Sequence, residues 1–199
     1  MFNTLSKKLN IIAISLLFAV GAIGLNGAVL KVDKSHSEVG FSIKHLMITN
    51  VNGNFSNFDA DIEYNIQSKK FEKFIATVMT TSINTGIEKR DDHLRSADFF
   101  EVEKYPTMNF SMNSYTLDGD EGMLSGDLTI HGITKKVTFE VENNGMIKDP
   151  WGNTRTAFTL EAKINRKDFA LNWNKALEAG GVLVGDTVKI TVEIEAIVQ

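Results

Sequence analysis

A two-residue alternation of apolar and polar side chains constrains the fold of this chain more than any other feature of its sequence. It is clearest in residues 123–142, MLSGDLTIHGITKKVTFEVE, where Val137, Phe139 and Val141 alternate with polar neighbours. That period is typical of a strand with one buried and one solvated face. Gly132 stands between two such arms and can adopt the positive φ that a tight turn needs. The stretch therefore predicts an antiparallel hairpin, which needs further strands to cover its apolar face.

The same alternation predicts strands along most of the chain. They cover residues 29–32, 37–45, 58–66, 71–83, 107–115, the two arms of 123–142, 156–164 and 188–198. We interpret the Asn/Gly-rich residues 46–55 as a bend, residues 143–153 as a loop and residues 175–178 as a helical turn. About eight antiparallel strands with one apolar face each predict an all-β fold, either a closed barrel or a sandwich. An eight-stranded barrel is either filled by its own side chains or holds one small ligand.

One segment, residues 88–95, has a helical rather than a strand period. Its sequence is EKRDDHLR, and Ile87 and Leu94 lie on one thin apolar stripe. The pattern predicts a short helix that covers one end of the sheet structure. The alternative is functional: Arg90, His93 and Arg95 would present positive charge to a polar or anionic head group.

The N-terminus has the order of a secretory signal peptide. Lys7 and Lys8 precede an apolar run over residues 11–25, which is shorter than the ~20 residues of a membrane span, and small residues follow at Gly27 and Ala28. We predict a signal peptide over residues 1–27, a mature domain over residues 28–199 and a periplasmic location. The alternative is an uncleaved N-terminal anchor.

Composition excludes several classes of function. The chain has no cysteine, which removes disulfides, thiol catalysis and thiolate metal sites. Its net charge is −4, and without Lys7 and Lys8 the 19 basic and 25 acidic residues give −6. With no cluster of lysine or arginine, such an acidic chain is a poor partner for nucleic acid.

The titratable residues give little support for catalysis. A metal-dependent hydrolase would draw its ligands from His36, His45, His93, His131, Asp91 and Asp92. Their spacing matches no metal-binding motif such as His-Glu-x-x-His, and no Gly-x-Ser-x-Gly elbow is present. We therefore predict no catalytic residues, no metal and no cofactor.

A set of short motifs in fixed order carries a family resemblance. The motifs are SEVGFSIKH at 37–45, SINT at 82–85, DHLRS at 92–96, DFF at 98–100, YPT at 105–107, GDLTIHG at 126–132 and RKDF at 166–169. In this combination the chain resembles the YceI-like family, which are bacterial, mostly exported proteins associated with binding polyisoprenoids or other long-chain amphiphiles. The resemblance covers residues 30–198, with one departure: family members often have glycine where this chain has Ala170.

The resemblance implies an eight-stranded antiparallel lipocalin-like barrel with a short covering helix and an elongated tunnel. It implies non-enzymatic binding, with the ligand tail inside and the head group near the helix. On that basis we predict tail contacts from Phe41, Ile43, Phe110, Met112, Phe139, Phe158 and Trp173. Head-group contacts are expected from His45, His93 and Arg95.

Energetics limit what such a tunnel can bind. Burial of a methylene group contributes ~0.8 kcal/mol, whereas association costs ~4–15 kcal/mol in lost freedom, so a tail shorter than ~15 carbons would bind poorly. The expected ligand is thus a long isoprenoid or a fatty-acid or fatty-amide type of lipid. Two alternatives stay open: a filled barrel that acts as a partner-binding or stress-protective protein, and a homodimer formed through outward-facing Thr and Asn side chains.

Overall fold

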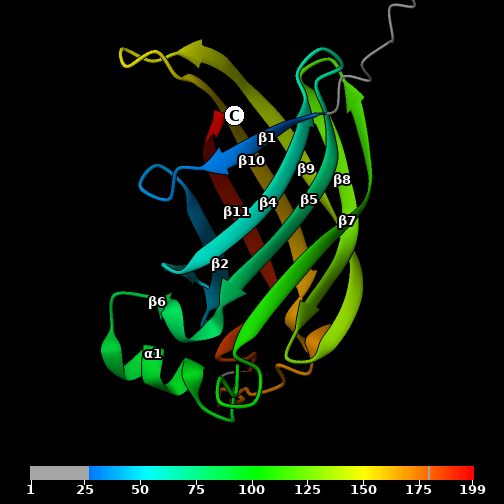
Figure 1. Cartoon of the computed structure of the whole chain (residues 1–199). Helices are drawn as coiled ribbons and strands as arrows, with labels where there is room; N and C mark the ends of the chain where they lie inside the picture. Colours follow the sequence, from blue (N-terminus) through cyan, green and yellow to red (C-terminus); the bar gives the residue numbers. More distant parts are fainter. Residues whose placement is uncertain (1–26, 179) are drawn as a thin grey trace, which may run out of the picture.

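The computed structural model describes residues 27–178 and 180–199, so the predicted signal peptide lies, apart from Gly27, outside the described residues. Figure 1 shows the strands wound around a common axis, with the helix α1 (Glu88–Arg95) at one end of the barrel. The strands are β1 (Ala28–Val32), β2 (Glu38–His45), β3 (Thr49–Phe55), β4 (Phe58–Asn65), β5 (Lys70–Met79), β6 (Ile83–Asn84), β7 (Thr107–Asp118), β8 (Glu121–Ile130), β9 (Ile133–Lys148), β10 (Thr154–Asn165) and β11 (Val184–Val198).

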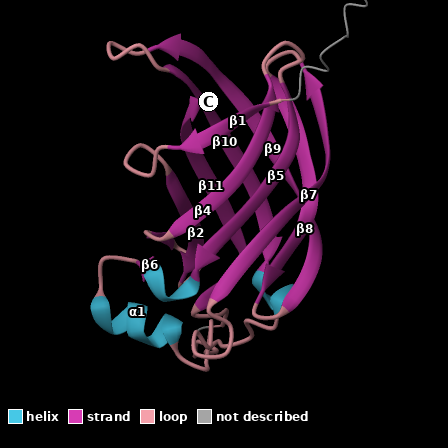
Figure 2. Cartoon of the chain, in the orientation of Figure 1, coloured by secondary structure: helices cyan, strands magenta, loops and turns pink. Residues whose placement is uncertain are grey.

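Helical structure is sparse (Figure 2). Besides α1, two short 3-10 helices, η1 (Thr80–Ser82) and η2 (Arg166–Phe169), lie at strand ends. The bounds of α1 are those predicted from the helical period. Within residues 27–178 and 180–199, no helix has the length and hydropathy required to cross a bilayer.

Eight strands close the barrel. Their order is β1-β4-β5-β7-β8-β9-β10-β11, and β11 pairs back with β1, all in antiparallel register. The long strand β11 has two partners along the same edge, β1 at Leu30↔Val198 and β2 at Ile43↔Val188. Strands β1 and β2 therefore share one position in the barrel, one after the other along the same edge of β11. The predicted eight-stranded antiparallel barrel is confirmed.

The predicted central hairpin is present as β8 and β9. A two-residue turn joins them, with His131 at φ 51° and Gly132 at φ 73°. Positive φ at both central residues is the geometry that matches the twist of paired strands. A Cβ at position 132 would lie 2.6 Å from the ring of Tyr105, so glycine is required there for space as well as for conformation.

Three local predictions are wrong. The expected bend at residues 46–55 contains β3, and the expected loop after residue 142 is strand as far as Lys148. In both segments the ladder hydrogen bonds to a neighbouring strand override the turn preference of Asn and Gly, because backbone pairing does not depend on side-chain type. The expected helical turn at residues 175–178 contains no helix, and Ala176 forms an isolated bridge with Val182.

The interior differs between the two ends of the barrel. At the end away from α1, aromatic rings fill the space: Phe158 lies 5.1 Å from Tyr64 and 4.8 Å from Phe71, measured between ring centroids, and Tyr115 lies 5.0 Å from Phe71. The Tyr64 hydroxyl accepts a hydrogen bond of 2.9 Å from Asn143. We call this the filled half, and the part nearer α1 the hollow half.

Candidate ligand cavity

The hollow half encloses a cavity of about 360 Å³. This volume falls within the ~300–1,000 Å³ typical of small-molecule sites. Its walls are almost entirely apolar and come from strands all around the barrel. They include Phe41, Ile43, Val51, Ala76, Val78, Phe110, Phe139, Val188, Ile190 and Val192.

Small inward-facing side chains on two neighbouring strands contribute to the cavity. On β5, Phe71 lies in the filled half, whereas Ala76 and Val78 line the cavity. On β4, Tyr64 likewise gives way to Ala60. The alanine and valine side chains leave space that the larger rings of the wall, such as Phe58 and Phe74, do not fill.

The helical segment closes the cavity at its end. Strand β6 pairs with β3 and, among the described residues, with no other strand, so its other edge is left unpaired next to α1. Leu94, Phe99 and Phe100, from α1 and the loop after it, line the cavity there. Phe100 packs edge-on against Phe55 at 5.8 Å. The predicted cover at one end of the sheet is therefore present, and it forms part of the cavity wall.

The structure brings seven of the ten predicted ligand-binding residues together. Those that line the cavity are Phe41, Ile43, His45, His93, Phe110, Phe139 and Trp173. The ring of His93 stacks edge-on against Trp173 at 4.8 Å, and its Nε2 lies 2.8 Å from Asp98 Oδ2.

The other three predicted residues lie outside the cavity wall. Phe158 is buried in the filled half, and Met112 is half-buried next to a bulge in β7 between Met112 and Ser114. Arg95 donates hydrogen bonds to the carbonyls of Thr81 (3.0 Å) and Ile83 (3.2 Å) and pairs with Asp92. Its guanidinium thus fastens α1 to the barrel wall instead of facing a ligand.

One buried, charged lining residue is absent from the predictions. Arg166, in η2, is 2% exposed and lines the cavity. Its Nε donates to the Gly185 carbonyl at 2.8 Å and its Nη1 donates to the Leu171 carbonyl. Burial lowers the pKa of Arg166, and the nearby Asp186 carboxylate only partly opposes that shift. In the sequence Arg166 is visible only as part of the RKDF motif, because strand alternation gives no reason to expect a buried arginine.

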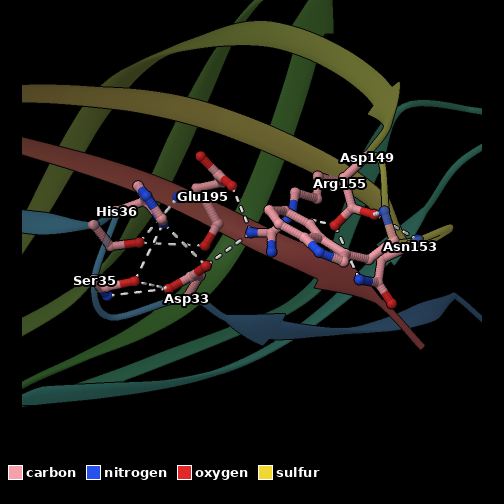
Figure 3. Close-up of polar contacts among 9 residues, drawn as sticks. Asp33, Ser35, His36, Asp149, Asn153, Arg155 and Glu195 are labelled. Atoms are coloured by element: carbon pink, nitrogen blue, oxygen red, sulfur yellow. Dashed lines mark hydrogen bonds and ion pairs between the residues drawn. The ribbon is translucent and has the colours of Figure 1, made fainter.

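A second cluster of polar groups lies away from the cavity (Figure 3). Asp33, His36 and Glu195 form the one group of three metal-ligating side chains found within the described part of the chain. The Arg155 Nη1 lies 2.7 Å from Asp33 Oδ2 and 2.6 Å from Glu195 Oε1, and its Nε lies 2.8 Å from Asp149 Oδ2. The guanidinium already supplies the positive charge these carboxylates need, so the cluster is an ion-pair network that joins β1, β10 and β11.

Local contacts in this network lower the pKa values of Asp33 and Asp149 strongly. Hydrogen bonds from Ser35 and then from Arg155 and His36 hold the pKa of Asp33 well below its usual range. The remaining histidines considered as metal ligands are elsewhere: His93 pairs with Asp98, and His131 Nε2 lies 3.4 Å from Glu101 Oε2. The residue set of a metal-dependent hydrolase is therefore dispersed over the molecule.

Comparison with known proteins assigns the barrel to a family. The model of the YceI-like domain matches residues 30–196. The chain belongs to the YceI-like family. The UPF0312 protein SA2479 of Staphylococcus aureus is 42% identical over 164 residues, which cover 82% of this chain and 94% of that protein. The resemblance stated from the sequence motifs is thus confirmed.

Solved structures of YceI-like proteins share the architecture. The YceI protein of Campylobacter jejuni superposes with a TM-score of 0.69 at 37% identity, covering 84% of this chain and 96% of that one. A domain of Saccharophagus degradans described as polyisoprenoid-binding superposes with a TM-score of 0.60 at 15% identity, covering 87% and 99% of the two chains. At that identity the second likeness shows the fold alone.

Proposed function

We propose that this YceI-like protein binds the hydrocarbon tail of a long-chain amphiphile, of polyisoprenoid or fatty-acyl type, and carries or sequesters it without chemical change. The observation that supports this function is the cavity of about 360 Å³ with apolar walls. A barrel that acted only through its outer surface would gain nothing from leaving such a cavity unfilled, because unfilled apolar space costs stability. The polyisoprenoid-binding description of the S. degradans domain agrees with this choice of ligand.

The size of the cavity sets the length of the tail. An apolar cavity of ~150 Å³ accommodates benzene, so the larger cavity here would hold on the order of 15 carbons. Burial of such a tail contributes about 12 kcal/mol at ~0.8 kcal/mol per methylene, against an association cost of ~4–15 kcal/mol. Net affinity is then sensitive to chain length, and a shorter tail would bind weakly.

The proposed site of action is the periplasm. This proposal rests on the order of basic, apolar and small residues in the first 28 positions. Removal of the leader next to Gly27 or Ala28 would leave β1 intact, because β1 begins at Ala28. The intact mass of protein recovered from the periplasmic fraction tests the cleavage position.

Native mass spectrometry tests the ligand. We expect protein purified from its own host without refolding to carry an extra mass, which dissociates on collisional activation and fragments as a long-chain lipid. The control is the same protein stripped by denaturation and refolding, which should be empty and should take up an added C20 isoprenoid alcohol or hexadecanoic acid. A native sample that is empty and also takes up neither compound would rule out the proposal.

A further inference from the structure

The polar side chains that line the cavity gather at its α1 end, and several are already engaged. Arg90 donates from Nε to the Thr85 hydroxyl at 2.7 Å and from Nη2 to the Thr85 carbonyl at 2.8 Å. His93 is paired with Asp98. These contacts hold α1 and its loop in place, and both side chains are partly exposed, so water can satisfy the donors that remain.

Arg166 differs because it is buried and part of its hydrogen-bonding capacity is still unused. A guanidinium carries five N–H donors. Nε and Nη1 donate to carbonyls of Gly185 and Leu171, but Nη2 is buried and has no hydrogen-bond partner in the part of the chain that the structure describes. Buried donors without an acceptor are costly, and each such group in a native protein calls for an explanation such as a bound ligand or water.

The charge around Arg166 is also incompletely balanced. Asp186 Oδ1 lies 3.5 Å from Nη2, beyond a good hydrogen bond, and it too lacks a hydrogen-bond partner among the described residues. The other oxygen of Asp186 accepts from Lys167 Nζ at 2.9 Å. One carboxylate therefore serves two cations, and the guanidinium is the buried one, with a side chain 3% exposed.

The strand next to Arg166 is shaped around this site. The pairing of β11 with β2 shifts register between Val184 and Val188, and Gly185 within that bulge presents its carbonyl to Arg166. His45, which also lines the cavity, pairs with Val184. Bulges commonly redirect groups next to binding sites. Arg166 thus stands at one end of the cavity, with the tail-binding walls of Phe110 and Phe139 further inside the barrel.

We propose that Arg166 anchors the ligand head group through Nη2, and that this head group presents a hydrogen-bond-accepting oxygen, bound most tightly when it is a carboxylate. This inference rests on the proposed function, since it assigns the polar end of the same ligand. It also sets the orientation of the ligand, with the oxygen at η2 and the tail directed toward the filled half.

The test compares head groups on one tail. Hexadecanoic acid, hexadecanamide and hexadecane would compete with the uncharged fluorophore N-phenyl-1-naphthylamine on the stripped full-length mature protein. We expect the acid and the amide to displace the fluorophore at concentrations at least about tenfold lower than hexadecane, because hydrogen bonds to charged groups contribute that much discrimination. Equal displacement by all three would overturn the role of Arg166, whereas displacement by none would overturn the proposed function itself.

Two variants locate the effect. Arg166→Met removes the guanidinium at similar length, and the ratio of hexadecane to hexadecanoic acid concentrations should fall toward one. Asp186→Asn keeps Arg166 and removes its counter-charge, so the preference for acid over amide should rise by about tenfold. Lys163→Met, at an exposed position on β10, makes the same charge change as Arg166→Met and should alter neither ratio.

The pair of variants keeps the test decisive if one of them does not fold. Arg166→Met removes the donors to two carbonyls, so its fold would be checked by far-ultraviolet circular dichroism and thermal melting. If it does not fold, Asp186→Asn decides, since Asp186 is 41% exposed at its side chain and lies at the rim. An acid-to-amide ratio in Asp186→Asn that matches the native ratio would contradict the proposal.

Discussion

The two halves of this barrel share the same strands but differ in what their inward positions carry. In the filled half, Tyr64, Phe71, Tyr115 and Phe158 meet ring to ring across the interior. In the hollow half, small residues such as Ala60 and Ala76 stand among the phenylalanines of the wall, and a cavity remains. Closure of the sheet alone thus does not decide between a core and a binding site. The volume of the inward-facing side chains decides between them. The filled half stabilises the barrel in which the hollow half forms its cavity.

The largest expected effect comes from removing a ring in the filled half. Phe158→Ala should lower the free energy of unfolding by ~3–5 kcal/mol, since the residue is 1% exposed and its neighbours cannot collapse into the space. Phe41→Ala is the matched substitution in the hollow half, where the ring already borders empty space and loses fewer contacts. Urea denaturation of stripped protein measures both. Equal losses would mean that the two halves do not differ in packing as described.

Filling the hollow half should have the next largest effect, on binding. Ala76→Phe places a ring into the cavity and should weaken hexadecanoic acid binding by at least about tenfold, or ~1.4 kcal/mol. Ile75→Phe enlarges the neighbouring residue, which is 41% exposed on the outer face of the sheet, and should leave binding unchanged. Fluorophore displacement measures both variants. Full affinity in Ala76→Phe would place the ligand outside the cavity.

Sequence alternation could predict the barrel because it is a local signal. The apolar face of a strand is visible in its own sequence. Strand β11 is predicted because every second residue up to Val198 is apolar. It could not predict β3 or the far end of β9, because Asn and Gly are held there by backbone pairing with neighbours distant in sequence. Strand propensity contains no information about such pairing.

The candidate site was predictable only in part, for a related reason. Inward parity correctly selects Phe41, Phe110 and Phe139 as cavity residues. Parity does not report depth along the barrel axis, so it selects Phe158 equally well, although that ring belongs to the filled half. Arg166 lies beyond the end of β10 in a 3-10 helix, where no alternation exists to indicate which way it points.

A smaller effect is expected at the Arg155 network, which touches neither interior. Because contacts with Ser35, Arg155 and His36 lower the folded-state pKa of Asp33, its ionised form stabilises the native state. That contribution is fully present above the unfolded pKa of ~3.9 and is lost as the pH falls toward the folded-state pKa. Asp33→Asn should therefore reduce the urea midpoint at pH 7 and have a smaller effect near pH 2, where part of the contribution is already lost. A difference that grows on acidification would contradict the sign of the shift.

The smallest expected change lies at Ala170, where this chain departs from the glycine that the family resemblance implies. Ala170 ends η2 in the left-handed region, at φ 59° and ψ 18°, and its N–H donates to the Lys167 carbonyl at 3.0 Å. A residue with a Cβ is strained in this conformation by roughly 1–2 kcal/mol, and glycine is not. Glycine in turn increases the conformational entropy of the unfolded chain, which offsets part of that gain. Ala170→Gly should then raise the free energy of unfolding by ~0.5–1 kcal/mol.

The matched control for this substitution lies within a strand. Ala157→Gly in β10, where the backbone is extended, should instead destabilise the protein by ~0.5–1 kcal/mol, because glycine there only adds freedom to the unfolded chain. Thermal or urea unfolding of stripped protein measures both changes. The residue Arg166 lies in η2, just before this turn. If Ala170→Gly stabilises the protein and keeps the preference for acid over hexadecane, the site depends on the left-handed backbone at position 170 and not on the alanine side chain. The free energy of unfolding should rise in Ala170→Gly and fall in Ala157→Gly. If Ala170→Gly loses stability instead, the methyl group of Ala170 stabilises the turn by more than its backbone strain costs.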